Sequence, residues 1–447
     1  MSEKKRGKPK QKKSSSVRHT RAVQRDRSKR AIVDAPEEQV AERLQEIIHP
    51  ATLSQVAHFH QEGLRERTLT LPVMVAFLLS LIWRQIAGVS ELARLVQREA
   101  LLWARPVKVS QQALSQRLSS LPAVLFDQIL QAILPTLDQC WQQRERPLLP
   151  ELAWAQAHYR RVVSVDGSTL DALIRKMGLL KDLPEHPLAG KMTALLDVCS
   201  RLPLHIWYEA NPKAHDQSFW ERIDAVLERG MLLIFDLGYT NFDRFGQLTA
   251  NGITFLTRAK KNLKYEVAQV LHRSAAVHDC IVWIGQGDSR QQVRLIEVLH
   301  KGKWYRYLTN ELDPLKMPVA YAVALYWQRW RIEDAYNIVK RLLGLAYFWS
   351  GSQNAVELQL WSTWILYGIL VDLTDDVAAA LKRPFAAISM EMIYRSLYFF
   401  TQAHARGEAD HLLTYLAHNA KSLGILKRKP PPGKLGALLR LTNPTQA

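Results

Sequence analysis

Residues 160–170, RRVVSVDGSTL, decide the fold of this 447-residue chain. Their β-branched run is typical of a strand, and it ends at Asp166 and a glycine, where a chain can turn. On the C-terminal side, residues 191–210 indicate two strands about a turn, residues 216–230 a helix, and residues 231–239, MLLIFDLGY, a fourth strand. We therefore predict an α/β fold.

The order strand, strand, strand, helix, strand is that of a ribonuclease-H-like core, although the composition also allows other α/β folds. Residues 241–252 predict a further helix and residues 253–259 a fifth strand. Between residues 260 and 310, apolar and polar residues alternate and turn residues separate the runs. We therefore expect a β-rich insertion in this region.

Residues 36–150 show helical periodicity interrupted by proline and glycine, which predicts an all-helical N-terminal domain. Within it, residues 109–122, VSQQALSQRLSSLP, have Ser110 as a candidate N-cap and polar residues on one side. Such a helix either reads a groove of DNA or packs within the domain, and the sequence leaves both interpretations open.

The charge of the chain favours a polyanionic partner such as nucleic acid. Lysine and arginine total 60 against 42 acidic residues, and the sequence pI is about 9.8. Residues 1–30 alone hold thirteen basic residues and two acids without an apolar run. We expect residues 1–35 to be a disordered arm that binds phosphate non-specifically or acts as a solubilising tail.

The cysteines and apolar runs exclude several classes of protein. Cys140, Cys199 and Cys280 lie far apart without CxxC spacing, which argues against a disulfide framework or zinc site and fits a reducing cytoplasm. The longest apolar run, residues 71–83, suits a buried helix and is shorter than a membrane span. The polar N-terminus lacks a signal-peptide core. We expect a cytoplasmic protein without a membrane partner.

Two aspartates follow apolar runs at corresponding places. Asp166 ends the first predicted strand and Asp236 the fourth, each with a glycine close behind. Either aspartate alone is more typical of a turn. If Glu333 faces the same sheet edge, the three carboxylates could hold two Mg²⁺ ions, an arrangement suited to phosphodiester hydrolysis and transesterification.

Residues 324–345, ALYWQRWRIEDAYNIVKRLLGL, predict a helix with two stripes. The polar stripe lies within an arc of roughly 60° and consists of Tyr326, Arg329, Glu333 and Lys340. The apolar stripe should face the core and consists of Leu325, Ile332, Val339 and Leu342. On helical spacing alone, the polar stripe could be a solvated flank with an Arg329–Glu333 pair.

The polar stripe matches Tyr-x2-Arg-x3-Glu-x6-Lys at all four positions and resembles the signature of bacterial DDE transposases of the insertion sequence four family. Residues 165–168, VDGS, and residues 236–239, DLGY, resemble the first and second Asp motifs of that family. The β-rich segment is similar to the insertion that the family carries between its second Asp and its Glu. The resemblance covers about residues 100 to 400.

This resemblance implies a DNA transposase that acts by a cut-and-paste route. A homodimer would pair the terminal inverted repeats and nick the DNA at the transposon end, and the freed 3′-OH would attack target DNA. Asp166, Asp236 and Glu333 would hold two Mg²⁺ ions, for which Mn²⁺ could substitute. Tyr326, Arg329 and Lys340 would contact DNA phosphates near the scissile bond. The enzyme would act in the bacterial cytoplasm, associated with the nucleoid.

Some members of the family cleave the second strand through a hairpin and hold a flipped base against an aromatic side chain, commonly Trp, in the insertion. The best-aligned residue in this chain is Tyr305, and Trp304 lies beside it on the opposite strand face. Both are candidate DNA-binding residues.

Two other candidate sites favour structural interpretations. His215 and Asp216, which precede a predicted helix, suit a helix cap better than a ligand pair. Ser168 and Thr169 follow Asp166 as in a nucleophile motif, but no histidine is arranged to activate them.

Two other functions remain open. One is a metal-dependent nuclease of the same fold without strand transfer, and the other is a catalytically silent DNA-binding protein derived from a transposase. The intact acidic triad argues against the silent protein.

The predicted organisation is an arm, a helical DNA-binding domain, a catalytic core split by the insertion, and a C-terminal helical region with a basic tail. The arm is residues 1–35 and the helical domain residues 36–155. The catalytic core is residues 156–258 with 312–400, and the insertion is residues 259–311. The C-terminal region is residues 401–447.

Overall fold

A computed structural model of the chain describes residues 38–65, 67–86, 88–171, 188–345, 348–349 and 352–427. The basic arm predicted over residues 1–35 lies outside the described residues, and so does most of the basic tail, from residue 428 onward.

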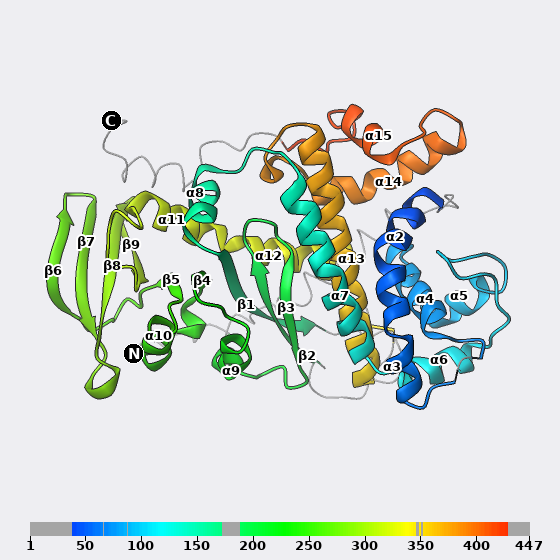
Figure 1. The fold of residues 1–447 in the computed structure, drawn as a ribbon, viewed down its shortest axis with the longest axis horizontal. Coiled ribbons are helices and arrows are strands. Elements are labelled where there is room, and N and C mark those ends of the chain that lie inside the picture. The colour runs from blue at the N-terminus through cyan, green and yellow to red at the C-terminus, as the bar shows by residue number, and fades with distance from the viewer. Residues whose placement is uncertain are drawn as a thin grey trace, which may run out of the picture.

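Within the described residues, nine strands form one mixed sheet, in the order β3-β2-β1-β4-β5-β9-β8-β7-β6 (Figure 1). β1 pairs with β4, and β4 with β5, in parallel, and the other neighbours are antiparallel. The strands are β1 Arg161–Asp171, β2 Leu188–Asp197, β3 Pro203–Glu209, β4 Met231–Phe235, β5 Thr254–Arg258, β6 Glu266–Arg273, β7 Val277–Ile284, β8 Gln291–His300 and β9 Lys303–Thr309.

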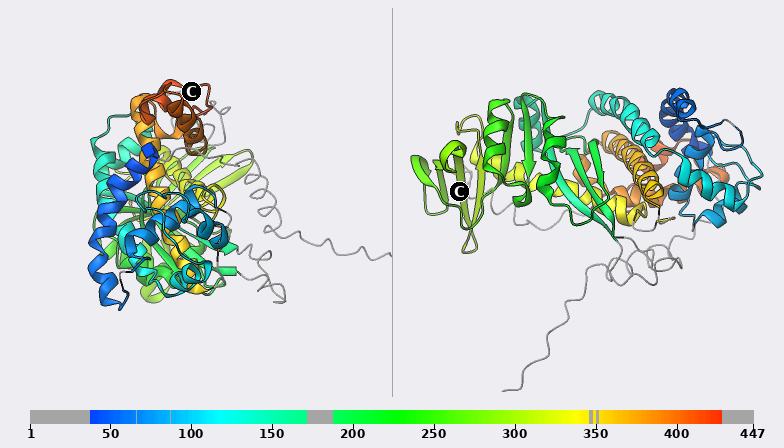
Figure 2. Two further views of the ribbon diagram at one scale, coloured as in Figure 1. Left: turned by 90° about the vertical axis from the view of Figure 1, so that its right-hand side faces the viewer. Right: turned by 90° about the horizontal axis from the view of Figure 1, so that it is seen from below.

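The predicted β-rich insertion therefore extends the central sheet. β9 pairs with β5 through residues 307–309, and β8, β7 and β6 follow in antiparallel order. Figures 1 and 2 place these outer strands at one end of the molecule and the N-terminal helices at the other.

Strand alternation determines where the two aspartates point. Val163 and Val165 of β1 pack in one core cluster, whereas Val162 packs in another, on the opposite face. The same alternation places Leu233 and Phe235 of β4 in the first cluster, and Leu232 and Ile234 in the second. The second cluster includes residues of helix α11, Val319–Gln328. Asp166 and Asp236 continue the even-numbered series and so face the α11 side of the sheet.

The prediction that Asp166 ends the first strand is wrong. The parallel pairing of β1 with β4 stops at Val165 and Phe235, but β1 runs on to Asp171 because its other edge continues to pair with β2. Asp166 thus lies where the parallel ladder opens, on a strand that is still held on one side.

The described residues between 38 and 158 form helices joined by loops, and the apolar run Leu71–Trp83 is a buried helix. Ser110 caps α6, and its side chain accepts a hydrogen bond from the Ala113 amide at 3.1 Å. The helices are α2 Glu38–Ser54, α3 Val56–Gln61, α4 Leu71–Trp83, α5 Val89–Leu95, α6 Gln111–Ser120, α7 Val124–Gln143 and α8 Pro150–His158. Among the described helices, none by itself has the length and apolarity to cross a membrane, and only α6 with α7, bent by 73°, meets those criteria as a pair.

The other described helices surround the sheet or follow it along the chain. They are η2 Asp216–Phe219, α9 Trp220–Asp224, η3 Leu237–Tyr239, α10 Phe242–Ala250, η4 Gly287–Ser289, α11 Val319–Gln328, α12 Trp330–Asn337, the π-helical turn Ile338–Leu342, α13 Gln353–Ala380, η6 Phe385–Ala387, α14 Met390–Ala405 and α15 Leu412–His418.

Two predicted helices differ from those observed. The helix expected over residues 216–230 ends at Asp224, because the chain then turns back to begin β4 at Met231. The single helix expected over residues 324–345 is three consecutive pieces, α11, α12 and the π-helical turn. Hydrogen bonds three residues apart tighten the chain at Arg329, and the π-helical turn widens it after Asn337. The predicted apolar stripe is nevertheless buried at all four positions.

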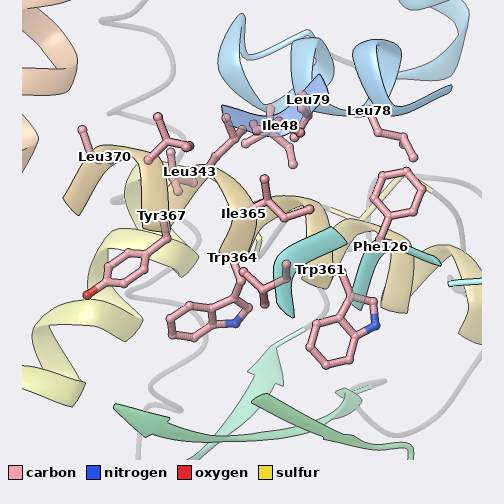
Figure 3. Close-up of a cluster of buried hydrophobic side chains, with 14 of the residues drawn as sticks. Ile48, Leu78, Leu79, Phe126, Leu343, Trp361, Trp364, Ile365, Tyr367 and Leu370 are labelled. Atoms are coloured by element: carbon pink, nitrogen blue, oxygen red, sulfur yellow. The ribbon is translucent and has the colours of Figure 1, made fainter. Parts of the chain in front are cut away.

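The largest hydrophobic cluster joins the N-terminal helices to the sheet through α13 (Figure 3). Ile48 of α2, Leu78 of α4 and Phe126 of α7 share this cluster with α13. On α13, Trp364 is fully buried, with its ring centroid 5.0 Å from that of Tyr367 and 6.2 Å from that of Tyr336 on α12. The helical N-terminal region therefore packs directly on the elements that surround the sheet.

An ionic network reinforces the same junction. Asp372, Asp375 and Asp376 project from α13 toward three arginines, Arg43 of α2, and Arg144 and Arg146 after α7. Asp372 and Asp375 are buried, so the arginines compensate charges that would otherwise be costly.

Replacing Trp364 with alanine should remove the central contact of this junction. We expect Trp364→Ala to lower the free energy of unfolding by about 3–5 kcal/mol, as is typical for deletion of a fully buried aromatic side chain. Chemical denaturation followed by circular dichroism measures the change. Phe399→Ala is the control, since Phe399 is 47% exposed, and it should cost less than about 1 kcal/mol. Equal effects of the two substitutions would contradict this account of the core.

Candidate active site

Three carboxylates from distant parts of the chain converge on one guanidinium. Arg329 Nη1 lies 2.9 Å from Asp166 Oδ2, and Arg329 Nη2 lies 3.0 Å from Glu333 Oε1 and 3.8 Å from Asp236 Oδ2. The Arg329 side chain is only 5% exposed, whereas those of Asp166, Asp236 and Glu333 are 22%, 41% and 37% exposed. The acidic groups therefore form an accessible cluster over a buried cation.

Local backbone contacts orient the two aspartates. The Gly167 amide donates to Asp166 Oδ1, and the Leu237 amide donates to Asp236 Oδ1, each at 2.8 Å. Because β1 and β4 are adjacent parallel strands whose pairing ends just before these residues, both carboxylates emerge at the same edge.

Two tyrosines hold the helices against this edge. Tyr326 of α11 donates its hydroxyl to Asp236 Oδ1 at 3.1 Å. Burial and the nearby Asp236 raise the pKa of Tyr326, so the phenol stays protonated and remains a donor. Tyr336 of α12 donates to the Asp166 carbonyl at 2.6 Å and accepts from the Ala194 amide at 3.1 Å.

Sequence reasoning did not identify Tyr336 as part of the site. Its position three residues after Glu333 and seven after Arg329 is the signal that could have identified it, because such residues lie close together on a helix.

Lys340 lies on the π-helical turn and binds the strand beyond Asp166. Its ammonium donates to Ser168 Oγ at 2.6 Å and to the carbonyl of Thr169. The structure therefore places Tyr326, Arg329, Glu333 and Lys340 on the side of the helices that faces the two aspartates. Tyr326, Arg329 and Lys340 thus contact protein groups at the site.

Tyr305 and Trp304 lie elsewhere, on β9, which is two strands from β4 in the sheet. Trp304 is 39% exposed and its ring lies 4.4 Å from that of His278 on β7. Tyr305 packs against the core cluster on the α11 side of the sheet. Strand β5 therefore lies between β9, which carries these two aromatic residues, and β4, which precedes Asp236.

Burial affects one carboxylate in particular. Loss of hydration raises the pKa of Asp166 to about 6, with smaller contributions from Glu333 and Asp236, while Arg329 opposes the shift. Near neutral pH, Asp166 is ionised, and Arg329 favours that ionised form against the cost of burial.

The donor chemistry fits divalent magnesium, which prefers carboxylate oxygens. With the side chains as they stand, no three carboxylate, imidazole or thiolate groups in the described ranges are spaced to share one ion. Ion binding would therefore require the carboxylates to rearrange around Arg329. The residues fit Mg²⁺ in the chemical type of their oxygen ligands and in lying close together.

Residues 185–369 match the family model described as "Transposase DDE domain". The matched range contains Asp236, Tyr326, Arg329, Glu333 and Lys340, and Asp166 lies before it. The chain is an enzyme of the DDE transposase type.

The chain is also similar to a transposase-like protein and to a solved transposase structure. The chain is 28% identical over 276 residues to a Sinorhizobium fredii protein named "Putative transposase y4zB", an alignment that covers 54% of this chain and 75% of the relative. A solved structure titled "Cryo-EM structure of piggyBac transposase synaptic complex with hairpin DNA (SNHP)" aligns with 87% of this chain and 84% of its own, at 12% identity and a TM-score of 0.42.

Removal of the central cation should make the stability of the metal-free transposase more sensitive to pH. The folded-state pKa of Asp166 already lies above its unfolded value, so stability falls as pH rises through that interval. In Arg329→Met the pKa of Asp166 should rise further. We expect little difference from wild type below about pH 6 and a loss growing to roughly 2–4 kcal/mol by pH 8.

Denaturation in EDTA between pH 5 and pH 8 measures this difference. Arg331→Met is the matched control, because Arg331 lies two residues further along, on α12, and pairs with Asp334, whose side chain is 60% exposed. A loss in Arg329→Met that does not depend on pH would show that the guanidinium does not stabilise ionised Asp166.

Proposed function

We propose that this DDE transposase belongs to the insertion sequence four family, cleaves DNA at transposon ends and joins those ends to target DNA by a cut-and-paste route. The observation that carries the proposal is the convergence of Asp166, Asp236 and Glu333 on Arg329. Tyr326, Arg329, Glu333 and Lys340 keep the family spacing, and each contacts the carboxylate cluster or the strand that carries Asp166.

The proposal includes a ribonuclease-H-like catalytic core. Its support is the sheet order β3-β2-β1-β4-β5, in which two antiparallel pairs are followed by two parallel pairs. The first and second aspartates lie on adjacent parallel strands, and the glutamate comes from a helix on one face.

Asp166, Asp236 and Glu333 would hold two Mg²⁺ ions, or Mn²⁺ in their place. Bound there, the ions would activate the attacking oxygen and stabilise the leaving oxygen of a phosphodiester. Tyr326 keeps Asp236 oriented through its protonated phenol. Arg329 and Lys340 provide positive charge beside the carboxylates, suited to holding DNA phosphates during the reaction.

In the overall reaction, water first attacks the phosphodiester at the transposon end, and the bond from phosphorus to the 3′ oxygen breaks. That oxygen takes a proton and becomes the free 3′-OH. The 3′-OH then loses its proton to solvent as it attacks a target phosphodiester, so strand transfer exchanges one ester bond for another and needs no external energy source.

Double-stranded DNA is the proposed partner, with a homodimer in the synaptic complex in the bacterial cytoplasm. The N-terminal helices offer one candidate reading element, α6, whose exposed face carries Gln111, Gln112, Ser115 and Gln116. Glutamine side chains can hydrogen-bond adenine in the major groove. Tyr305 and Trp304 on β9 remain candidates for holding an unstacked base.

Alanine substitutions of the triad should separate chemistry from binding. We expect Asp166→Ala, Asp236→Ala and Glu333→Ala each to lower single-turnover cleavage of an inverted-repeat DNA in Mg²⁺ by at least about a thousandfold, because each removes an ion ligand. DNA affinity should stay within about threefold, since basic residues supply it.

Asp334→Ala is the control on the same helix, next to Glu333, and should cleave like wild type. Cleavage that survives any triad substitution would remove that residue from the active site. Products in which donor ends are joined to target DNA distinguish a transposase from a nuclease of the same fold.

Deleting residues 1–30 should weaken non-specific DNA binding and flatten its dependence on salt. The deleted segment holds thirteen basic residues, and fewer phosphate contacts release fewer counterions. Binding to unrelated duplex DNA, measured between 50 and 200 mM salt, tests the expectation. An unchanged slope would mean that the arm does not contact DNA.

A further inference from the structure

An ion pair between a buried lysine and a partly exposed aspartate lies next to the carboxylate cluster. Lys191 on β2 is 8% exposed, and its ammonium lies 2.5 Å from Asp216 Oδ1 and donates to the Ala214 carbonyl at 2.7 Å. Asp216 begins η2, which follows β3 in the chain. The pair therefore ties a loop after β3 to the strand beside β1.

Asp216 is not the cap of the helix that it begins. The cap is His215, whose ring accepts a hydrogen bond from the Gln217 amide at 3.3 Å. The sequence-based prediction of a helix cap thus accounts for His215 and leaves the role of Asp216 open.

The Asp216 carboxylate lies between the backbone segments that follow two triad residues. A Cβ added at Gly167, directly after Asp166, would lie 2.7 Å from Asp216 Oδ1. A Cβ added at Gly238, two residues after Asp236, would lie 2.5 Å from Asp216 Oδ2. Neither glycine has a positive φ, so backbone conformation does not require glycine at either position. In the observed arrangement, a Cβ at either glycine would force the Asp216 carboxylate to shift.

Lys191 completes this packing. Its Cε would lie 2.8 Å from a Cβ at Gly167, so the lysine covers that glycine while its ammonium holds Asp216. One carboxylate, fixed by one buried ammonium, thereby spans the gap that opens where β1 and β4 stop pairing.

We propose that Lys191 and Asp216 form a positioning pair that sets the separation of the Asp166 and Asp236 carboxylates and so their affinity for divalent ions. This inference rests on the proposed function, in which those two carboxylates share the ions. Asp216 acts through the backbone at Gly167 and Gly238. Its charge is matched by Lys191, so the pair adds no net charge to the cluster.

Two substitutions separate positioning from simple electrostatics. Asp216→Asn leaves the positive charge of Lys191 beside the site, and charge alone would weaken cation binding. Lys191→Met leaves the negative charge of Asp216, and charge alone would strengthen it. Positioning predicts that both substitutions weaken binding, by roughly 10–100-fold, as for other residues that orient metal ligands.

The experiment measures Mn²⁺ binding by electron paramagnetic resonance, with the full chain bound to uncleaved inverted-repeat DNA. The control is Glu228→Gln, which disrupts the Arg160–Glu228 pair of similar length, 2.7 Å, at the other end of β1 and β4. The control should bind Mn²⁺ like wild type. Melting temperatures, recorded in parallel, identify variants that merely lose stability.

Gly238→Ala provides a variant that keeps both charges and only displaces the Asp216 carboxylate, and it should also weaken Mn²⁺ binding. Wild-type affinity in Gly238→Ala, or opposite shifts in Asp216→Asn and Lys191→Met, would overturn the positioning role.

Asp166→Ala distinguishes failure of the proposed metal site from failure of the positioning pair. If it binds Mn²⁺ like wild type, the metal site itself is wrong and the inference falls with it. If it loses Mn²⁺ while the pair variants keep it, only the inference is wrong.

Discussion

The structure of the site depends on the interaction of one buried guanidinium with three carboxylates. Three acidic groups within reach of one another repel, and burial of Asp166 adds a cost of dehydration. Arg329 offsets both effects because its planar guanidinium donates to Asp166 and Glu333 at once and lies 3.8 Å from Asp236 Oδ2. A lysine, with a compact charge at the end of a flexible chain, could not make this set of contacts in the same way. The fold thus tolerates three neighbouring negative charges because one arginine compensates them.

The sheet determines where the two aspartates lie. Two adjacent parallel strands place Asp166 and Asp236 at one edge, on the face that α11 covers. Tyr326 and Tyr336 then fasten the helices to that edge through Asp236 and the carbonyl of Asp166. Arg329 is located at the tightened turn between α11 and α12, so its position follows from both helices being anchored.

Much of this arrangement could be predicted from the sequence because it follows from local periodicity. Apolar runs that end in an aspartate and a glycine located Asp166 and Asp236, and helical spacing placed Arg329 and Glu333 on one face. Spacing does not reveal partners across the fold, so the contacts of Arg329 with the aspartates needed the structure. The position of Asp216 could not be predicted from spacing at all, since its place between Gly167 and Gly238 depends on the path of a loop. The continuity of β5 with β9 was equally invisible, because strand alternation does not specify which edge a strand joins.

The wide separation of the triad in the chain has a consequence for synthesis on the ribosome. Residues 166, 236 and 333 meet only after β4 has paired with β1 and the helices beyond the outer strands have docked. The basic N-terminal segment and the helices from α2 to α8 are complete long before Arg329 emerges. An unfinished chain can therefore carry its positive charge and N-terminal helices while the carboxylates are still apart. Long-range pairing of this kind delays assembly of the carboxylate cluster until the segment around Arg329 and Glu333 has been made. Under the proposed function, an incomplete chain therefore lacks the assembled groups that DNA cleavage requires.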